Sequence, residues 1–304
     1  MVKLKYVIFP LLTLLILITI SCQIQTTNTK KSIVVTYSVL GSIVKELVGD
    51  ETDVTVSIPN GLDPHEWEPS AKDIETINKA DMIIENGLGL ENGMEKTLQI
   101  ARNKGTVFFT ATDHITIRHV GLGEGIPSGD PDQALGAPDP HFWLDPVSMK
   151  DVVVALTSTL MNKLNIDASA QAKVIEARLD NLNNAIINVV SEIPMENHKL
   201  VTGHESMGYF AQRYGFQLTG VIMPSLSTQA AVSVADLAEL KKIIMATHVK
   251  TIFSELGTSQ AIAQTIAYET GVSVVELSTH VLPPDGSYYT FMEDVANTIA
   301  NSLK

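Results

Sequence analysis

The sequence predicts an α/β protein with two lobes, each built on a mainly parallel sheet flanked by helices, and joined to each other by one long helix. From Ile33 onward, short runs of β-branched and aliphatic residues alternate with amphipathic stretches, which is the βαβα order of a parallel sheet. A segment without glycine or proline, from Ala168 to Ile193, separates two such series. The expected order is therefore lobe, helix, lobe.

Four short apolar runs predict the strands of the first lobe, with amphipathic helices between them. Ser70 followed by Asp73 resembles a capping box, and Asp145 before Pro146 is typical of an N-cap followed by a first-turn proline. Each pair predicts the start of a helix. The predicted strands are Ile33–Tyr37, Val54–Ile58, Met82–Ile84 and Val107–Phe109.

The long helix is predicted because its apolar residues recur every three or four positions, and Pro194 ends it. Residues 32–165 are expected to form the N-terminal lobe, 166–194 the connecting helix and 195–304 the C-terminal lobe. The periodic apolar residues are Ile175, Leu179, Leu182, Ile186, Val189 and Ile193. The strands expected after the helix are Leu200–Thr202, Leu218–Met223, Thr251–Phe253 and Val272–Val275.

Residues 1–22 are typical of a secretion signal. Lys3 and Lys5 precede an apolar run from Tyr6 to Ile20, which is shorter than the roughly 20 residues that a helix needs to cross a bilayer. Without those two lysines, the chain has 19 basic and 34 acidic residues, which give a net charge of −15. Such a surface repels nucleic acid, so nucleic-acid binding is excluded, and it is compatible with a cationic ligand.

Cys22 is the only cysteine, which excludes an internal disulfide. It follows the small residue Ser21, as the lipid-attachment cysteine of a lipobox does, although Thr19 stands where that motif usually has an aliphatic residue. We expect acylation of Cys22 and a flexible tether over residues 23–31; the alternative is ordinary cleavage that leaves a free thiol. The protein is then exported and held at a membrane.

Residues 121–140 are rich in glycine, proline and aspartate, and they are too long and irregular for a simple turn. This pattern predicts a functional or mobile loop. His114 and His119 flank its start and are expected to be solvated surface histidines. His198 and His248 are likewise expected at the surface.

The tripeptide Asp-Pro-His occurs twice, ending at His65 and at His141. Proline fixes its own φ and pushes the preceding residue toward an extended conformation, so each histidine sits on a stiffened loop and loses little entropy on coordination. His204 follows another predicted strand, and ligands collect at the carboxyl ends of parallel strands. A lone histidine is more often structural, but the repeated motif with a third equivalent residue predicts one metal site between the lobes.

Residues 61–70, 139–146 and 203–215 resemble three signature segments of the zinc and manganese solute-binding lipoproteins of ABC importers (cluster A-I, ZnuA-like and TroA-like). The resemblance extends from about residue 32 to the end of the chain. It implies two Rossmann-like lobes that hold one metal ion in the interlobe cleft and deliver it to a membrane permease, without enzymatic activity. It also implies a location on the outer face of the cytoplasmic membrane or in the periplasm, and we expect a monomer.

In that family the fourth ligand is normally an Asp or Glu shortly before an aromatic motif resembling Tyr288–Tyr289. Here the matching position holds His280, and the nearest carboxylate is Asp285, so either residue can close the site. Four neutral imidazoles leave a dication whose charge the surroundings must balance. Glu255 matches a family glutamate and is expected to bind a ligand imidazole or to complete a nearby salt bridge.

Two further glutamates, Glu66 and Glu205, adjoin ligand histidines and are expected to face solvent or helix N-termini. Imidazole nitrogen suits zinc, whereas manganese prefers more oxygen, and manganese-selective members of the family tend to replace the third histidine with glutamate. His204 therefore favours zinc, with manganese as the alternative cargo. Because each imidazole must be neutral to bind, affinity is expected to fall below roughly pH 6.

Two other classes of zinc protein remain as alternatives. A zinc hydrolase needs three protein ligands, an open position for water and a general base, and the sequence has no helical His-Glu-x-x-His spacing. An adhesin that is stabilised by metal would lose its fold on chelation, whereas a carrier stays folded when empty. The long connecting helix is expected to limit the lobes to small shifts.

Overall fold

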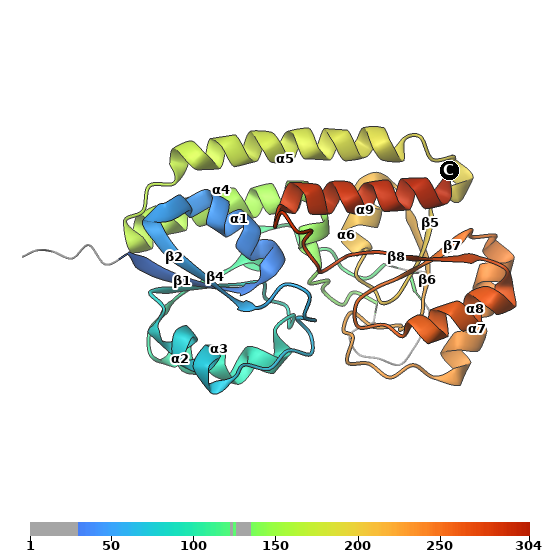
Figure 1. Cartoon of the computed structure of the whole chain (residues 1–304), viewed down its shortest axis with the longest axis horizontal. Helices are drawn as coiled ribbons and strands as arrows, with labels where there is room; N and C mark the ends of the chain where they lie inside the picture. The colour runs from blue at the N-terminus through green and yellow to red at the C-terminus, as the bar shows by residue number, and fades with distance from the viewer. Residues whose placement is uncertain (1–29, 122–123, 126–134) are drawn as a thin grey trace, which may run out of the picture.

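The computed structural model describes residues 30–121, 124–125 and 135–304. The predicted signal peptide, Cys22, most of the tether and much of the 121–140 loop lie outside the described residues. Figure 1 shows two lobes, with the long helix α5 (Ser169–Val190) running above both of them. The α/β class, the parallel strands and the connecting helix are confirmed.

The first lobe contains a four-stranded parallel sheet of order β2-β1-β3-β4. Burial agrees with this order, because the last five residues of central β1 are buried whereas edge strand β2 alternates with exposed positions. Lys31, which was expected in the tether, is the first residue of β1, because its backbone pairs in register with Thr52. The strands are β1 (Lys31–Tyr37), β2 (Thr52–Ile58), β3 (Met82–Glu85) and β4 (Val107–Thr110).

The predicted helix starts are confirmed by their capping contacts. The Ser70 side chain accepts the N–H of Asp73, and the Asp73 carboxylate accepts the N–H of Ser70 in return. The Asp145 carboxylate accepts the N–H of Val147 at the start of α4, where proline occupies the first turn. The helices of this lobe are α1 (Ser38–Val48), α2 (Ala71–Lys79), α3 (Glu95–Asn103) and α4 (Pro146–Leu164).

In the second lobe the strands are again parallel, but their hydrogen bonds divide them into two pairs, β5-β6 and β7-β8. A separate small core, which includes Ile222, Ile244 and Ile252, lies between these strands and their helices. The strands are β5 (Lys199–Thr202), β6 (Gln217–Val221), β7 (Thr251–Ser254) and β8 (Ser273–Glu276). The helices are α6 (Gly208–Tyr214), α7 (Val234–Thr247) and α8 (Gln260–Thr270).

The last helix, α9 (Tyr288–Leu303), packs along α5 and also contacts α1 of the first lobe (Figure 1). Its buried residues, including Tyr288, Phe291 and Met292, belong to the same apolar core as the first-lobe strands. The loop before α9 therefore crosses to the first lobe, and α9 then runs back so that the chain ends against the second lobe (Figure 1). Among the described residues, no helix combines the length and the apolar character that a membrane span requires.

Candidate metal centre

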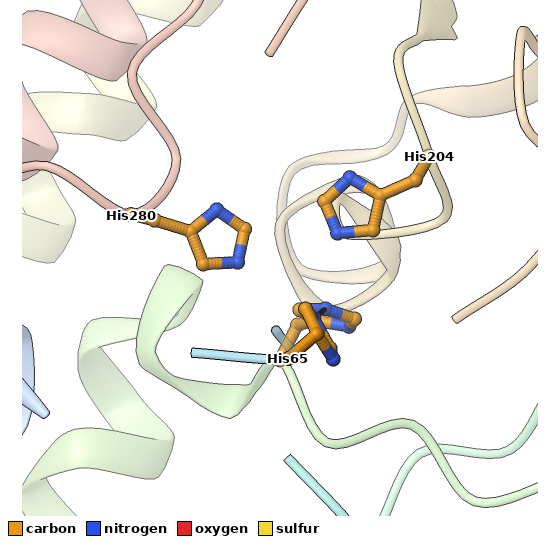
Figure 2. Close-up of side chains that lie close together, drawn as sticks. His65, His204 and His280 are labelled. Atoms are coloured by element: carbon orange, nitrogen blue, oxygen red, sulfur yellow. Dashed lines mark hydrogen bonds between the residues drawn. The ribbon is translucent and has the colours of Figure 1, made fainter. Parts of the chain in front are cut away.

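Four buried histidines meet where the two lobes face each other. One ring nitrogen from each of His65, His141, His204 and His280 lies within 4.8 Å of the others. Figure 2 shows the rings of His65, His204 and His280 around one central space. The structure thus brings together the three histidines predicted from separate loops, and of the two alternatives for a fourth group it brings in His280.

Each histidine lies on a loop that follows a parallel strand. His65 follows β2, His141 follows β4 through the 121–140 loop, His204 follows β5 and His280 follows β8. The carboxyl ends of parallel strands lie at one edge of a sheet, so each lobe directs its loops toward the other lobe. This topology explains how residues more than 200 positions apart in sequence contribute to one cluster.

Both Asp-Pro-His motifs form the same local turn. Oδ1 of Asp63 accepts the backbone N–H of His65 at 2.9 Å, and Oδ1 of Asp139 accepts that of His141 at 2.9 Å. Such a side-chain turn fixes the backbone of the histidine two residues later. This role of the two aspartates was not predicted from the sequence, although the Asp of the motif is repeated along with the proline and the histidine.

Three of the rings are oriented through Nδ1. Nδ1 of His141 lies 2.9 Å from Oδ1 of Asp139. Nδ1 of His204 lies 2.6 Å from Oε2 of Glu255, and Nδ1 of His280 lies 2.9 Å from Oγ1 of Thr279. An imidazole that is held through one nitrogen presents the other to a metal, so Nε2 is the free ligand atom in these residues.

The Nε2 atoms of His204 and His280 are buried and have no hydrogen-bond partner in the described part of the chain. Buried polar atoms without partners are costly, which favours a ligand at this position. The Nε2 atoms of His65 and His141 are 3.3 Å apart. Two nitrogens at about 2.0–2.1 Å from a tetrahedral zinc ion would be about 3.4 Å apart, so this pair already has the required spacing.

Glu255 lies where the sequence predicted it, against a ligand imidazole. Its carboxylate also accepts the Ser206 hydroxyl at 2.9 Å, and its side chain is fully buried. Asp139 is the second buried carboxylate beside the cluster, and Arg118 holds its other oxygen at 3.0 Å. These two carboxylates place negative charge beside the four imidazoles, and this charge would offset that of a dication.

The pKa values of His65 and His280 are both lowered well below the ordinary histidine value. Burial is the main cause, and the neighbouring imidazoles add to it. The pKa of His141 is also lowered, because burial outweighs the opposing effect of Asp139. These three rings are therefore neutral at neutral pH and ready to act as ligands.

His204 differs from the other three. Burial lowers its pKa, but the charge and hydrogen bond of Glu255 more than offset that effect, and the pKa is raised above the ordinary value. In the metal-free protein His204 is consequently the ring that holds a proton most readily, and a metal ion must displace that proton.

Asp285 lies outside the cluster. Its Oδ1 accepts the N–H of Ser287 at 3.0 Å and its Oδ2 accepts the hydroxyl of Thr290 at 2.7 Å, so it braces the start of α9. Glu66 is exposed, as expected. Of the two positions expected for Glu205, solvent is excluded, because the residue is buried and its N–H donates to the carbonyl of Ser225; a position at the N-terminus of α6, which begins at Gly208, stays a prediction.

The remaining histidines take no part in the cluster. His114 and His119 are exposed, as expected, with His114 stacked on Phe109, and His248 is exposed at the end of α7. His198 is partly exposed at the surface, where its ring stacks on Phe216 with the ring centres 4.5 Å apart.

A cavity of about 430 Å³ adjoins the cluster through His65. It is lined on one side by Leu88 and Pro140 of the first lobe and on the other by Leu226 and Ser227 of the second. His65 is the member of the cluster that lines this cavity.

Comparison with known proteins places these features in context. The family model described as the periplasmic component A of a zinc-uptake complex matches residues 33–302. A high-affinity zinc uptake system protein, ZnuA, from Bacillus subtilis is 29% identical over 82% of this chain and 78% of its own length. A manganese-binding lipoprotein, MntA, from Halalkalibacterium halodurans is 25% identical over 98% of this chain and 99% of its own. The periplasmic zinc-binding protein TroA from Treponema pallidum has the same fold, with a TM-score of 0.75, 24% identity and coverage of 90% and 99%.

Proposed function

We propose that this chain, which belongs to the ZnuA/TroA family of metal-binding solute-binding proteins of ABC importers, carries zinc as its cargo and delivers it to a membrane permease. Members of this family bind solutes and are not enzymes. The proposed ligands are Nε2 of His65, His141, His204 and His280. Asp139 and Glu255 would orient two of these rings and balance the charge of the ion.

The observation that carries the choice of zinc is the all-nitrogen ligand set. Four imidazoles and no carboxylate make up the cluster found among the described residues, and zinc accepts such a tetrahedral set whereas manganese prefers oxygen. Four protein ligands also leave no open position for the activated water of a zinc hydrolase. The relatives include proteins named for zinc and for manganese, so the names of the relatives do not decide the cargo.

The location follows from the same proposal. The curated relatives include lipoproteins, and the N-terminal segment has the pattern of a lipoprotein signal ending at Cys22. We propose that Cys22 carries the lipid and holds the protein outside the cytoplasm, beside the permease that receives the ion.

Calorimetric titration of the metal-free mature protein with zinc and with manganese tests the cargo. We expect one zinc per chain, bound more tightly than manganese. His141→Ala should abolish tight binding, and His248→Ala, which removes an exposed histidine that is not part of the cluster, should leave it unchanged. Manganese binding that equals or exceeds zinc binding would reverse the assignment of the cargo.

A further inference from the structure

The loop that carries His280 is bound to the first lobe, although it belongs to the second in chain order. The Asn60 side chain makes two hydrogen bonds to the backbone of one residue of this loop, Leu282. Its Nδ2 donates to the Leu282 carbonyl at 2.9 Å, and its Oδ1 accepts the Leu282 N–H at 2.8 Å. Asn60 lies at the end of the strand that leads to the His65 loop, so one segment carries His65 and holds the loop of His280.

Trp143 and Ser42 hold the two ends of the same loop. The indole N–H of Trp143 donates to the Thr279 carbonyl at 2.8 Å, directly before His280. The Ser42 hydroxyl donates to the Gly286 carbonyl at 2.7 Å. Within the described chain, the hydrogen bonds that join residues 279–288 to other segments all go to the first lobe.

His204 shows the opposite attachment. Its ring contacts Glu255, its carbonyl accepts the hydroxyl of Thr202, and the next N–H donates to Ser225. All three partners belong to the second lobe. The loops of His65, His141 and His280 are therefore attached to the first lobe, with one further bond from Gln229 of the second lobe to the His65 carbonyl, whereas the contacts of His204 are with the second lobe.

We propose that Asn60 is a positioning residue that fixes the His280 loop to the first lobe, so that His65, His141 and His280 form one half-site and His204 is the ligand that closes it. This inference rests on the proposed metal-binding function and deepens it. A small separation of the lobes would then detach one ligand, His204, and leave a three-histidine site from which the ion passes on.

Asn60→Ala is a suitable test because Asn60 is exposed, so its truncation leaves no buried cavity. The loss of two neutral hydrogen bonds should weaken zinc binding about tenfold, since His280 would no longer be held in place. Asn60→Asp keeps the acceptor for the Leu282 N–H and loses the donor, and it should give a smaller loss. Asn103→Ala, at an exposed asparagine of the same lobe, is the matched control and should have no effect.

A double-mutant cycle separates positioning from a general effect on structure. Zinc affinity is measured by competition with a chelator of known affinity, for Asn60→Ala in three backgrounds: wild type, His204→Ala and His280→Ala. The same loss is expected in the first two backgrounds, and no loss is expected in His280→Ala, because Asn60 acts through His280. Amide hydrogen exchange at Leu282 should become faster in Asn60→Ala while exchange around His204 stays unchanged.

Equal losses in all three backgrounds, or an unchanged affinity of Asn60→Ala, would overturn the positioning role. Failure of the wild-type protein to bind zinc would instead overturn the proposed function on which the inference rests. The two failures are therefore distinguished by the wild-type titration alone.

Discussion

Nδ1 of His204 lies 2.6 Å from Oε2 of Glu255, and both side chains are fully buried. The contact fixes the ring so that Nε2 faces the other three histidines, and it places a negative charge beside the ligand. A metal ion that displaces the proton of His204 replaces one positive charge with two near the same carboxylate. This pair is therefore expected to influence both the affinity and its dependence on pH.

Replacement of Glu255 by glutamine should weaken zinc binding by roughly 10- to 100-fold, the range typical of residues that orient a ligand imidazole. Glutamine keeps the size of the side chain and removes its charge, so the fold should be preserved. Competition titration checks the affinity. Glu276→Gln, at an exposed glutamate that ends β8, is the control, and an equal effect of both substitutions would contradict the special role of Glu255.

Zinc binding near neutral pH should release a proton from His204. The raised pKa of His204 means that its protonated form competes with the metal at a higher pH than the proton of an ordinary histidine would. Affinity should rise with pH until His204 is neutral and then level off. Calorimetry in buffers of different ionisation enthalpy counts the released protons, and Glu255→Gln should release fewer at pH 7. Equal proton release by both proteins would refute this assignment.

The alternatives for the fourth ligand have different expected effects. His280→Ala removes a buried ring of the cluster and should weaken zinc binding by more than the 10- to 100-fold typical of an outer residue. Asp285→Ala should leave the affinity unchanged and only lower the melting temperature slightly, because Asp285 braces α9. Loss of tight binding in Asp285→Ala, with tight binding kept in His280→Ala, would instead identify Asp285 as the fourth ligand.

Removal of the metal should leave the protein folded. The main apolar core extends from the first-lobe strands to α5 and α9 and does not depend on the histidine cluster. Circular dichroism after chelation should therefore retain the helical signal, as a cargo carrier requires. Zinc at a free concentration of 100 times its dissociation constant should add about 2.7 kcal/mol to the free energy of unfolding. Collapse of the structure on chelation would favour a structural metal instead.

Local signals in the sequence predicted most of the fold. The β-branched runs located the eight strands to within about two residues, and Ser70–Asp73 and Asp145–Pro146 marked two helix starts. The apolar period over residues 168–193 predicted α5 because one face of that helix is buried. These features depend on neighbouring residues, which is why a single sequence reveals them.

Tertiary contacts were beyond the reach of local patterns. The pattern gave no reason to expect that α9 packs on α5, or that Asn60 binds the backbone of Leu282, 222 positions away. The choice between His280 and Asp285 depended on the path of one loop, and the burial of Glu205 depended on the segment around Ser225. Asp63 and Asp139 were visible in the repeated motif, but their turns required backbone geometry.

The coordination of bound zinc tests the central claim most directly. X-ray absorption spectroscopy of the zinc-loaded mature protein should show four nitrogen ligands at about 2.0–2.1 Å, with the scattering pattern of imidazole rings and no oxygen. A site with three nitrogens and a bound water, or with a carboxylate oxygen as its fourth ligand, would contradict the four-histidine carrier that is proposed here.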